Sequence, residues 1–376
     1  MRAIKSKRFN HMSFKPRLSR RDFLKLSSLG LGALALRPFA RPWEKLPYLA
    51  DFPESERLGR AVDPEVTIRA RPTTESEEVG TLTEDTIVPW LRETVGYTPY
   101  RNQRWVETPD GYIWAPLLQP VRNLPNAPLG ALPTASNGPG QWVEVTVPYA
   151  DVSLANSQPL GPRVRFLLGN FRPIRLYYGQ VMWADQIQTN EDGSVLYHIS
   201  EPRGSYGDTF WGPAEAFRPI TAEEITPLSP EVENKYVLID INRQTLSCFE
   251  NEREVYFCRI SSGREGNETP VSPYFNIFWK LMSVHMSGGT TGAGFDLAGV
   301  AWTSVFAKDG IAIHGTFWHN NFGERTSAGC VNATPEDAKF VFRWTSPYVP
   351  YDPGYVDIGE VGTAFGAGTN IRVVQY

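Results

Sequence analysis

Short runs of alternating apolar and polar residues, separated by glycine and proline, make up most of this sequence. The chain has 376 residues, of which 32 are glycine and 31 are proline. Proline removes a backbone donor and glycine weakens helix interiors, so this frequent punctuation suits short strands and tight turns rather than long helices. The sequence therefore predicts a mainly β protein, and its length predicts two or three domains.

Residues 1–45 have the layout of an export signal. Basic residues come first, the segment SRRDFLK follows from Ser19 to Lys25, and an apolar run extends from Leu24 to Leu36. The segment resembles the twin-arginine motif, which implies export by the twin-arginine translocation machinery to the cell wall or the extracytoplasmic face. No Ala-x-Ala sequence precedes Arg37, so both a cleaved signal and an uncleaved membrane anchor stay open.

Charge and cysteine usage limit the partners of the chain. The formal net charge is −4, with 37 lysines and arginines against 41 aspartates and glutamates. The chain has no excess of positive charge, so we do not expect it to bind nucleic acid. There are three cysteines and no Cys-x-x-Cys pair. We therefore expect no metal and no cofactor, and at least one unpaired thiol.

Two β modules are predicted after a linker from Arg41 to Arg60. Residues 61–122 contain five short strand signals and the turn signal Asp110-Gly111. The segments IRARP and DGYIWAPLLQPV in this part resemble bacterial SH3-like domains, which implies a small barrel. Residues 123–140 are predicted to be a linker. Residues 141–221 are predicted to be a second, degenerate module, because YGDTFWGPAEAFRPI near their end echoes PDGYIWAPLLQPV.

Residues 235–376 are predicted to form a final β domain that contains one helix. A hairpin is expected near Asn251, with Cys248 and Cys258 as buried core residues rather than a disulfide. Further strands are expected at 274–280, 310–314 and 370–374. Thr334 is positioned to cap a helix that starts with Pro335, because apolar residues then recur at helical spacing.

A histidine and a cysteine in this last domain are candidates for covalent catalysis. His314 ends a predicted strand, and Cys330 follows 16 residues later within Ser327-Ala-Gly-Cys. A neighbouring imidazole can hold a cysteine as its nucleophilic thiolate. Gly329 lets the backbone approach a substrate carbonyl, and amide groups around Gly329 and Cys330 could then stabilise an oxyanion. Either residue alone is commonly structural, but the two together at this spacing favour catalysis.

The residues around this pair resemble the L,D-transpeptidase catalytic domain. That family carries His-Gly-Thr, a loop, and Ser-His-Gly-Cys followed by any residue and Arg or Asn. The resemblance implies a β-sandwich with a short helix after the nucleophile loop. It also implies that Cys330 is the nucleophile and His314 its base, oriented by the Gly315 carbonyl. In this sequence the first part of the family pattern is His314-Gly315-Thr316, and the second part is the segment from Ser327 to Asn332.

The resemblance to L,D-transpeptidases also implies a reaction and its substrates. The resemblance implies cross-linking of peptidoglycan: Cys330 would form a thioester with a donor stem peptide, with loss of D-alanine, and an acceptor amine would resolve it to a 3→3 cross-link. It also implies substrate-binding roles for four residues: Thr316, Trp318, His319 and Asn332. Segments at Thr269 to Ile277 and at Met286 to Gly289 are similar to other parts of the family pattern. Ala328 departs from it, because it replaces the usual second histidine.

Two alternative functions remain open from the sequence. A Cys-His peptidoglycan hydrolase is one, although the papain-like order places Cys before His. A sortase would need a much longer His–Cys interval. A wall-binding protein without catalysis is the second alternative, and Ala328 is its only support.

Overall fold

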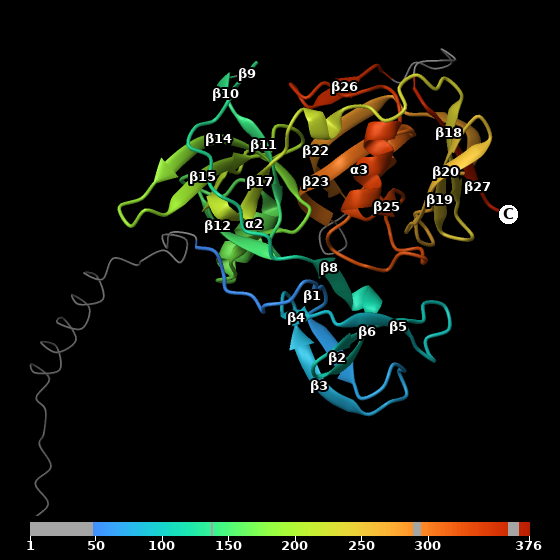
Figure 1. The fold of residues 1–376 in the computed structure, drawn as a ribbon, viewed down its shortest axis with the longest axis horizontal. Coiled ribbons are helices and arrows are strands. Elements are labelled where there is room, and N and C mark those ends of the chain that lie inside the picture. The colour runs from blue at the N-terminus through green and yellow to red at the C-terminus, as the bar shows by residue number, and fades with distance from the viewer. Residues whose placement is uncertain (1–47, 137, 289–294, 360–367) are drawn as a thin grey trace, which may run out of the picture. The chain divides into compact units, whose positions relative to one another are not determined.

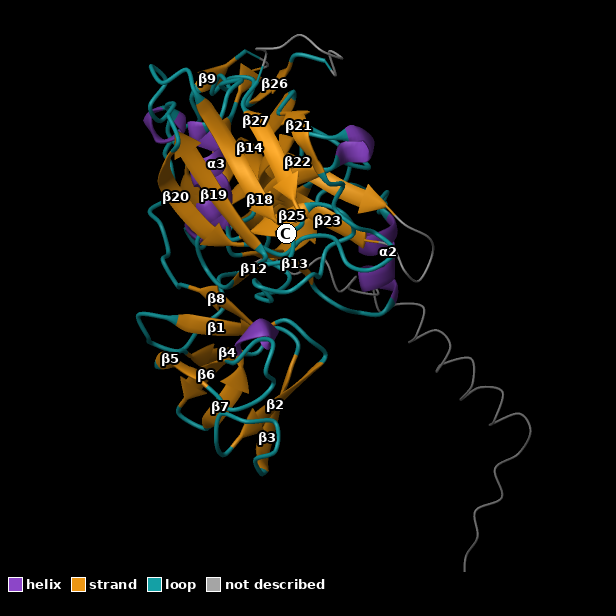
Figure 2. Cartoon of the chain, turned by 90° about the vertical axis from the view of Figure 1, so that its right-hand side faces the viewer, coloured by secondary structure: helices purple, strands orange, loops and turns teal. Residues whose placement is uncertain are grey.

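The computed structural model describes residues 48–136, 138–288, 295–359 and 368–376. The predicted export signal lies outside the described residues, as does Gly289 at the end of the predicted Met286 segment. Most of the regular structure that is described is strand (Figures 1 and 2), so the prediction of a mainly β fold is confirmed. No helix among the described residues is long and apolar enough to cross a membrane.

The first β module has two small sheets, with strand orders β3-β2-β7-β6-β5 and β4-β1-β8. Its strands are β1 (Leu58–Ala61), β2 (Glu65–Arg69), β3 (Glu78–Thr83), β4 (Ile87–Pro89), β5 (Arg92–Val95), β6 (Arg104–Thr108), β7 (Gly111–Trp114) and β8 (Leu118–Val121). The predicted turn joins β6 to β7. Gly111 there has φ +139°, and a Cβ atom would lie 2.6 Å from the Arg69 carbonyl oxygen, so only glycine fits without strain.

Strand β1 corrects the predicted linker from Arg41 to Arg60. All four residues of β1 are buried, and the strand pairs with both β4 and β8. The linker was predicted from proline and charge content. Composition does not show that Arg60 is buried and paired with Asp85, so the strand was missed.

The second β module is a seven-stranded sheet in the order β13-β12-β16-β15-β14-β11-β17. Its elements are β11 (Gln141–Val145), β12 (Tyr149–Leu154), α2 (Pro162–Gly169), β13 (Ile174–Tyr177), β14 (Val181–Thr189), β15 (Val195–Ser200), β16 (Phe210–Pro213) and β17 (Phe217–Pro219). A two-residue pair, β9 (Thr134–Ala135) with β10 (Gly138–Pro139), precedes it.

The two segments that echo one another in sequence share one local structure. In the first, a 3-10 turn η2 (Ala115–Leu117) joins β7 to β8, and in the second, η3 (Ala214–Ala216) joins β16 to β17. The residues before the two turns have φ/ψ of −63°/120° and −63°/121°, and those after them −122°/116° and −118°/122°. The sequence echo therefore corresponds to the same strand–turn–strand unit.

The remaining residues form two five-stranded sheets, β20-β19-β18-β27-β21 and β25-β24-β23-β22-β26. The elements are η4 (Glu223–Ile225), β18 (Lys235–Asp240), β19 (Thr245–Glu250), β20 (Arg253–Arg259), β21 (Ser272–Asn276), β22 (Trp279–Gly288), β23 (Phe295–Val305), η5 (Lys308–Gly310), β24 (Ala312–Gly315), β25 (Val331–Ala333), α3 (Pro335–Trp344), β26 (Tyr355–Asp357) and β27 (Asn370–Val374).

The strand predicted over 274–280 is divided in the structure. The first part, β21, pairs with β27 in one sheet, whereas β22 pairs with β23 and β26 in the other. Buried Ile277 lies between them. The prediction was wrong because a continuous alternating run does not show at which residue a chain crosses from one sheet to another.

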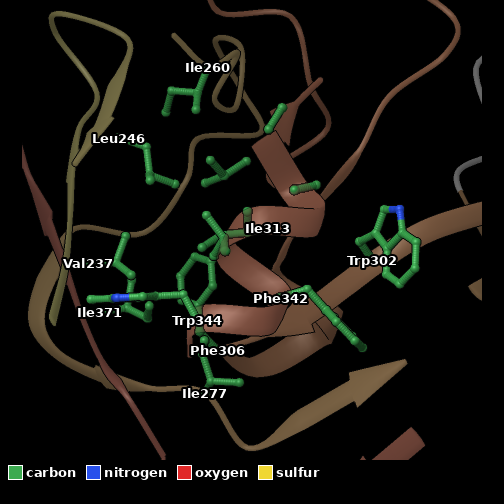
Figure 3. Close-up of a cluster of buried hydrophobic side chains, with 14 of the residues drawn as sticks. Val237, Leu246, Ile260, Ile277, Trp302, Phe306, Ile313, Phe342, Trp344 and Ile371 are labelled. Carbon is green, nitrogen blue, oxygen red and sulfur yellow. The ribbon is translucent and has the colours of Figure 1, made fainter. Parts of the chain in front are cut away.

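One apolar core joins the two sheets to helix α3 (Figure 3). Val237 and Ile371 from the first sheet, and Ile313 and Trp302 from the second, belong to the same buried cluster as Phe342 of the helix. The helix begins as predicted, because the Thr334 hydroxyl accepts a hydrogen bond from the Asp337 N–H and Pro335 occupies the first turn.

Two buried lysines complete the other end of α3. Lys280 Nζ donates to the carbonyl oxygens of Phe342 and Thr345 at 2.5 and 2.6 Å, and Lys235 Nζ donates to that of Trp344 at 3.1 Å. The last carbonyls of a helix have no partner within the helix. The two amines satisfy them, and because both side chains are removed from water, the pKa of each lysine is lowered. Helix α3 is thereby held at both ends beside the strands that carry the candidate catalytic residues.

Candidate active site

His314 and Cys330 are brought together by two parallel strands. Strand β24 pairs with β25 so that Ile313 lies opposite Val331 and His314 opposite Asn332. Cys330 immediately precedes β25, and the backbone N–H of Ala312 is directed at its sulfur. Because side chains alternate along strands, His314 and Cys330 share one face and lie diagonally across the strand pair.

The imidazole of His314 is buried and oriented by backbone. Its Nδ1 lies 3.1 Å from the Gly315 carbonyl oxygen, and the side chain is 2% exposed. A carbonyl only accepts hydrogen bonds, so Nδ1 carries the proton and Nε2 has the free lone pair. Burial lowers the pKa of His314 to about 4, although the Gly315 carbonyl opposes the shift. His314 is therefore a neutral base at neutral pH.

The thiol of Cys330 is partly exposed and protonated. It packs against the buried residues Leu281, Val305 and Ala312, and its Sγ lies 3.7 Å from the Gly310 carbonyl oxygen. Removal of water raises the pKa of Cys330, and the Ala312 N–H offsets only part of this. The expected thiolate held by an imidazolium is thus corrected to a neutral thiol beside a neutral imidazole, because no charged group faces either one among the described residues.

The loop before Cys330 is fixed by hydrogen bonds within itself and to Thr269. The Ser327 hydroxyl donates to the Cys330 carbonyl and accepts from the Gly329 N–H at 3.1 Å. The Thr269 hydroxyl donates to the Gly329 carbonyl at 2.7 Å. Gly329 has φ +122°, a conformation that favours glycine. The Gly329 N–H is therefore already engaged. Among the described residues the Cys330 N–H donates to no other group, which leaves it free for an oxyanion.

The residues predicted to bind substrate differ in their exposure. Trp318 is half-buried and lies beside the base, with ring centroids of Trp318 and His314 5.7 Å apart. Thr316, His319 and Asn332 are buried. Trp318 is the member of this set that the structure leaves open to a ligand next to His314.

His319 and Asn332 form a buried polar pair instead of an exposed subsite. The Asn321 N–H donates to His319 Nδ1 at 3.1 Å, so the proton of the neutral ring is on Nε2. Nε2 lies 2.8 Å from the Asn332 amide, whose oxygen must therefore face the ring. Burial lowers the pKa of His319 to about 3. This pair stabilises residues 316–321, which we name the His–Cys loop, against the start of β25.

The comparisons with known proteins concern these residues directly. The YkuD family model, which describes the L,D-transpeptidase catalytic domain, matches residues 234–371. These residues are an L,D-transpeptidase catalytic domain. They include both His314 and Cys330. Among curated proteins, no sequence matches the chain.

Solved structures that resemble the chain are L,D-transpeptidases of low sequence identity. One from Enterococcus faecium is 21% identical, with 39% of this chain and 51% of that chain covered and a TM-score of 0.29. This chain thus spans about half the length of that enzyme. One from Mycobacterium smegmatis is 15% identical, with coverages of 50% and 98% and a TM-score of 0.30. L,D-transpeptidase 3 from Mycobacterium tuberculosis is 17% identical, with coverages of 66% and 99% and a TM-score of 0.29.

The sequence did not indicate how the L,D-transpeptidase domain meets the modules before it. Arg60 donates to the Phe317 carbonyl oxygen at 2.6 Å, directly beside Trp318. Its position within a charge-rich segment carried no signal, because a buried and a solvated arginine look alike in sequence. His285 likewise pairs with Glu201 of the second module and with Asp296, partners that the local sequence does not indicate. In the described part of the chain, no group of three His, Cys, Asp or Glu side chains is arranged to hold a metal ion.

Proposed function

We propose that this protein is a peptidoglycan L,D-transpeptidase that forms 3→3 cross-links through a thioester on Cys330. The observation that carries the proposal is the pairing of β24 with β25. It sets a neutral imidazole with a free Nε2 diagonally across from a partly exposed thiol. A neutral base and a protonated nucleophile are the reactants that general-base catalysis at neutral pH requires.

Acylation begins with the thiol of Cys330 and the donor stem. His314 Nε2 takes the thiol proton as Sγ bonds to the carbonyl carbon of the third stem residue. The Cys330 N–H, which has no partner among the described residues, would stabilise the oxyanion that develops. When the tetrahedral intermediate collapses, the bond to D-alanine breaks and its nitrogen takes the proton from His314. The products of this step are a thioester and free D-alanine.

Deacylation returns the enzyme to its starting state. An amine of an acceptor stem gives a proton to His314 and attacks the thioester carbonyl. The carbon–sulfur bond then breaks, and Cys330 takes back the proton from the imidazolium. The net reaction exchanges one amide bond for another, so no cofactor is consumed.

Purified protein incubated with tetrapeptide muropeptides tests the proposal. We expect cross-linked dimers and an equal amount of free D-alanine, both absent in Cys330→Ser and retained in Cys248→Ser. Cleaved stems without dimers would identify a hydrolase instead. No product of either kind from folded protein would favour a wall-binding protein without catalysis.

A β-lactam adduct tests the nucleophile separately from the acceptor. We expect a carbapenem to add its mass to the intact protein at Cys330, and simple penicillins to do so poorly, as the family resemblance implies. The Cys330→Ser variant should gain no mass. A stable penicillin adduct without a carbapenem adduct would contradict the assignment.

We propose, further, that the protein reaches the cell wall through the twin-arginine route. The support is the sequence from Ser19 to Lys25 and the apolar run that follows it. Replacement of Arg20 and Arg21 by lysine keeps the charge but removes the features that the translocation machinery reads. The double variant should accumulate in the cytoplasm, and its normal export would exclude this route.

A further inference from the structure

We propose that Arg60, which lies in the first β module, is a positioning residue for the catalytic base. It holds the His–Cys loop so that Trp318 supports the His314 ring. The first module would then help to fix the geometry of the active site, in addition to any role in wall binding. This inference rests on the proposed function only where it concerns the rate of cross-linking.

Arg60 is buried and uses its guanidinium on three partners. It donates through Nε to the side chain of Gln119 at 2.9 Å, through Nη1 to Asp85 at 2.7 Å, and through Nη2 to the Phe317 carbonyl oxygen at 2.6 Å. It is 3% exposed. A buried charge must be paired and hydrogen-bonded, so these contacts hold the group in one geometry. One arm of that fixed group reaches the His–Cys loop.

The pairing of Asp85 extends this cluster into the second module. Asp85 also accepts from Arg175 at 2.8 Å and from the Tyr177 hydroxyl at 3.2 Å, and Arg175 is paired in turn with Asp151. Asp85 therefore faces two arginines. The two arginines of the cluster are balanced by two carboxylates, those of Asp85 and Asp151. The carbonyl of Phe317 is fixed by a network that both modules build.

An aromatic series connects this cluster to the base. The Arg60 guanidinium lies 4.1 Å from the ring centroid of Tyr177, and Tyr177 stacks on Phe317 at 5.7 Å with an interplanar angle of 20°. Phe317 meets Trp318 edge-on at 5.0 Å, and Trp318 lies 5.7 Å from the His314 ring. Each contact restricts the next ring, because aromatic pairs favour particular angles. A change at Arg60 therefore has a physical route to His314.

The first module also satisfies the backbone of the same loop further along. The Asn320 side chain donates to the Ala115 carbonyl at 3.1 Å, and the Asn320 N–H donates to that of Pro116 at 3.3 Å. Asn102 contacts Asn321 at 3.3 Å. The His–Cys loop thus takes several of its hydrogen bonds from another module. Its conformation depends on that module as well as on the catalytic domain.

The test compares Arg60→Met with Arg92→Met in the full-length protein. Methionine keeps the apolar length of Arg60 without its donors, and Arg92 is an exposed arginine of the same module that pairs with Glu107. We expect Arg60→Met to lower kcat about 10- to 100-fold, with KM for the donor changed roughly twofold or less, because the base is misplaced rather than the substrate. Arg92→Met should match the wild type in both constants.

A second readout does not depend on any substrate. The chain has only five histidines, so NMR of protein labelled in its histidine rings can follow His314 separately. His319 is the titratable group that interacts electrostatically with His314, and Cys330 lies diagonally across the strand pair from it. Among the described residues β23 and α3 place no charge on His314. Loosening the loop admits water, so the pKa of His314 should rise from about 4 toward 6.5 in Arg60→Met by about one unit or more. It should not move in Arg92→Met.

The double variant Arg60→Met/Asp85→Asn is the control for misfolding. This double variant removes both charges and leaves Arg175 paired with Asp151. It should melt cooperatively and still show the reduced kcat and the raised His314 pKa. A folded double variant with wild-type kcat and wild-type His314 titration would overturn the proposal. If the wild type forms no cross-links at all, the proposed function fails, whereas the NMR titration still tests the role of Arg60.

Discussion

Two histidines in one sheet have opposite electrostatic surroundings. His314 in β24 meets the Gly315 carbonyl and no carboxylate, and burial lowers its pKa to about 4. The side chain of His285 in β22 is 8% exposed, and its two ring nitrogens lie 2.8 Å from Glu201 and 2.8 Å from Asp296. Burial lowers the pKa of His285 as well, yet the two carboxylates outweigh it and the net shift is upward.

The contrast shows how the surroundings of a strand histidine lower its pKa in one place and raise it in another. Both rings are removed from water, so burial by itself makes each one neutral. The pKa values differ because, among the described residues, two carboxylates face His285 and none faces His314. Glu201 directly follows β15 in the second module, and Asp296 lies on the neighbouring strand β23. We expect His314 to exchange protons during catalysis and His285 to hold a charge that joins two parts of the molecule.

The largest effect should separate the two histidines by activity. His314→Gln should lower the rate of cross-linking about 100- to 10,000-fold, the range for removal of a general base. His285→Gln should retain activity within roughly threefold, because it contacts no reacting atom. Both are measured as kcat with tetrapeptide muropeptides. An equal loss in the two variants would mean that His314 acts through stability rather than through catalysis.

The second effect concerns the protonation state of the pair at rest. Alkylation of Cys330 by iodoacetamide should be slow at pH 7 and accelerate only above about pH 8.5, since the pKa of Cys330 is raised. His314→Gln should leave this profile nearly unchanged. Mass spectrometry locates the label, and Cys248 and Cys258 serve as slower internal references because burial raises their pKa values further. Fast alkylation below pH 7 that disappears in His314→Gln would instead establish a thiolate–imidazolium pair.

A smaller effect is expected on stability when His285 loses one carboxylate. Glu201→Gln leaves a donor facing the His285 ring and weakens the bond to the Gly299 N–H, now 2.6 Å. The free energy of unfolding should fall by about 1–3 kcal/mol, the cost of an unsatisfied buried group. Glu191→Gln, in an exposed turn of the same module, should change it by less than about 0.5 kcal/mol. Denaturant unfolding that gives equal values for both would show that the His285 cluster adds no stability.

The smallest effect is a pH dependence of opposite sign for the two histidines. Folded His285 binds its proton more tightly than the unfolded chain, so its contribution is complete below pH 6.5 and is lost as pH rises through its folded pKa. Folded His314 binds its proton less tightly, so its contribution is present above pH 6.5 and is lost as pH falls toward 4. Melting curves of His285→Gln should therefore flatten only the alkaline side. A flattening below pH 6.5 would contradict this assignment.

Local features of the sequence predicted part of the site correctly. Thr334 caps α3, and the helix begins with Pro335, because capping depends on residues within one turn of each other. The Ser327 to Cys330 segment folds on hydrogen bonds among its own neighbours. The tight turn before Gly111 follows the same rule. In the helix cap and in the Ser327 bonds the interacting groups are a few residues apart, so the sequence contains those interactions. The Thr269 bond to Gly329 and the Arg69 carbonyl beside Gly111 come from distant parts of the chain.

Other features depend on residues that are distant in the chain. Three features each need a partner from another strand or module: the split of 274–280 between two sheets, the burial of Arg60, and the raised pKa of His285. Residue types at those positions are compatible with several environments, and only packing selects one. The Ser-x-Gly-Cys and His-Gly-Thr segments thus allowed the sequence to predict the L,D-transpeptidase catalytic domain that the family model matches. The fold supplied the neutral state of His314 and Cys330, because the pKa of a buried group is set by which charges the surrounding elements bring within a few ångströms.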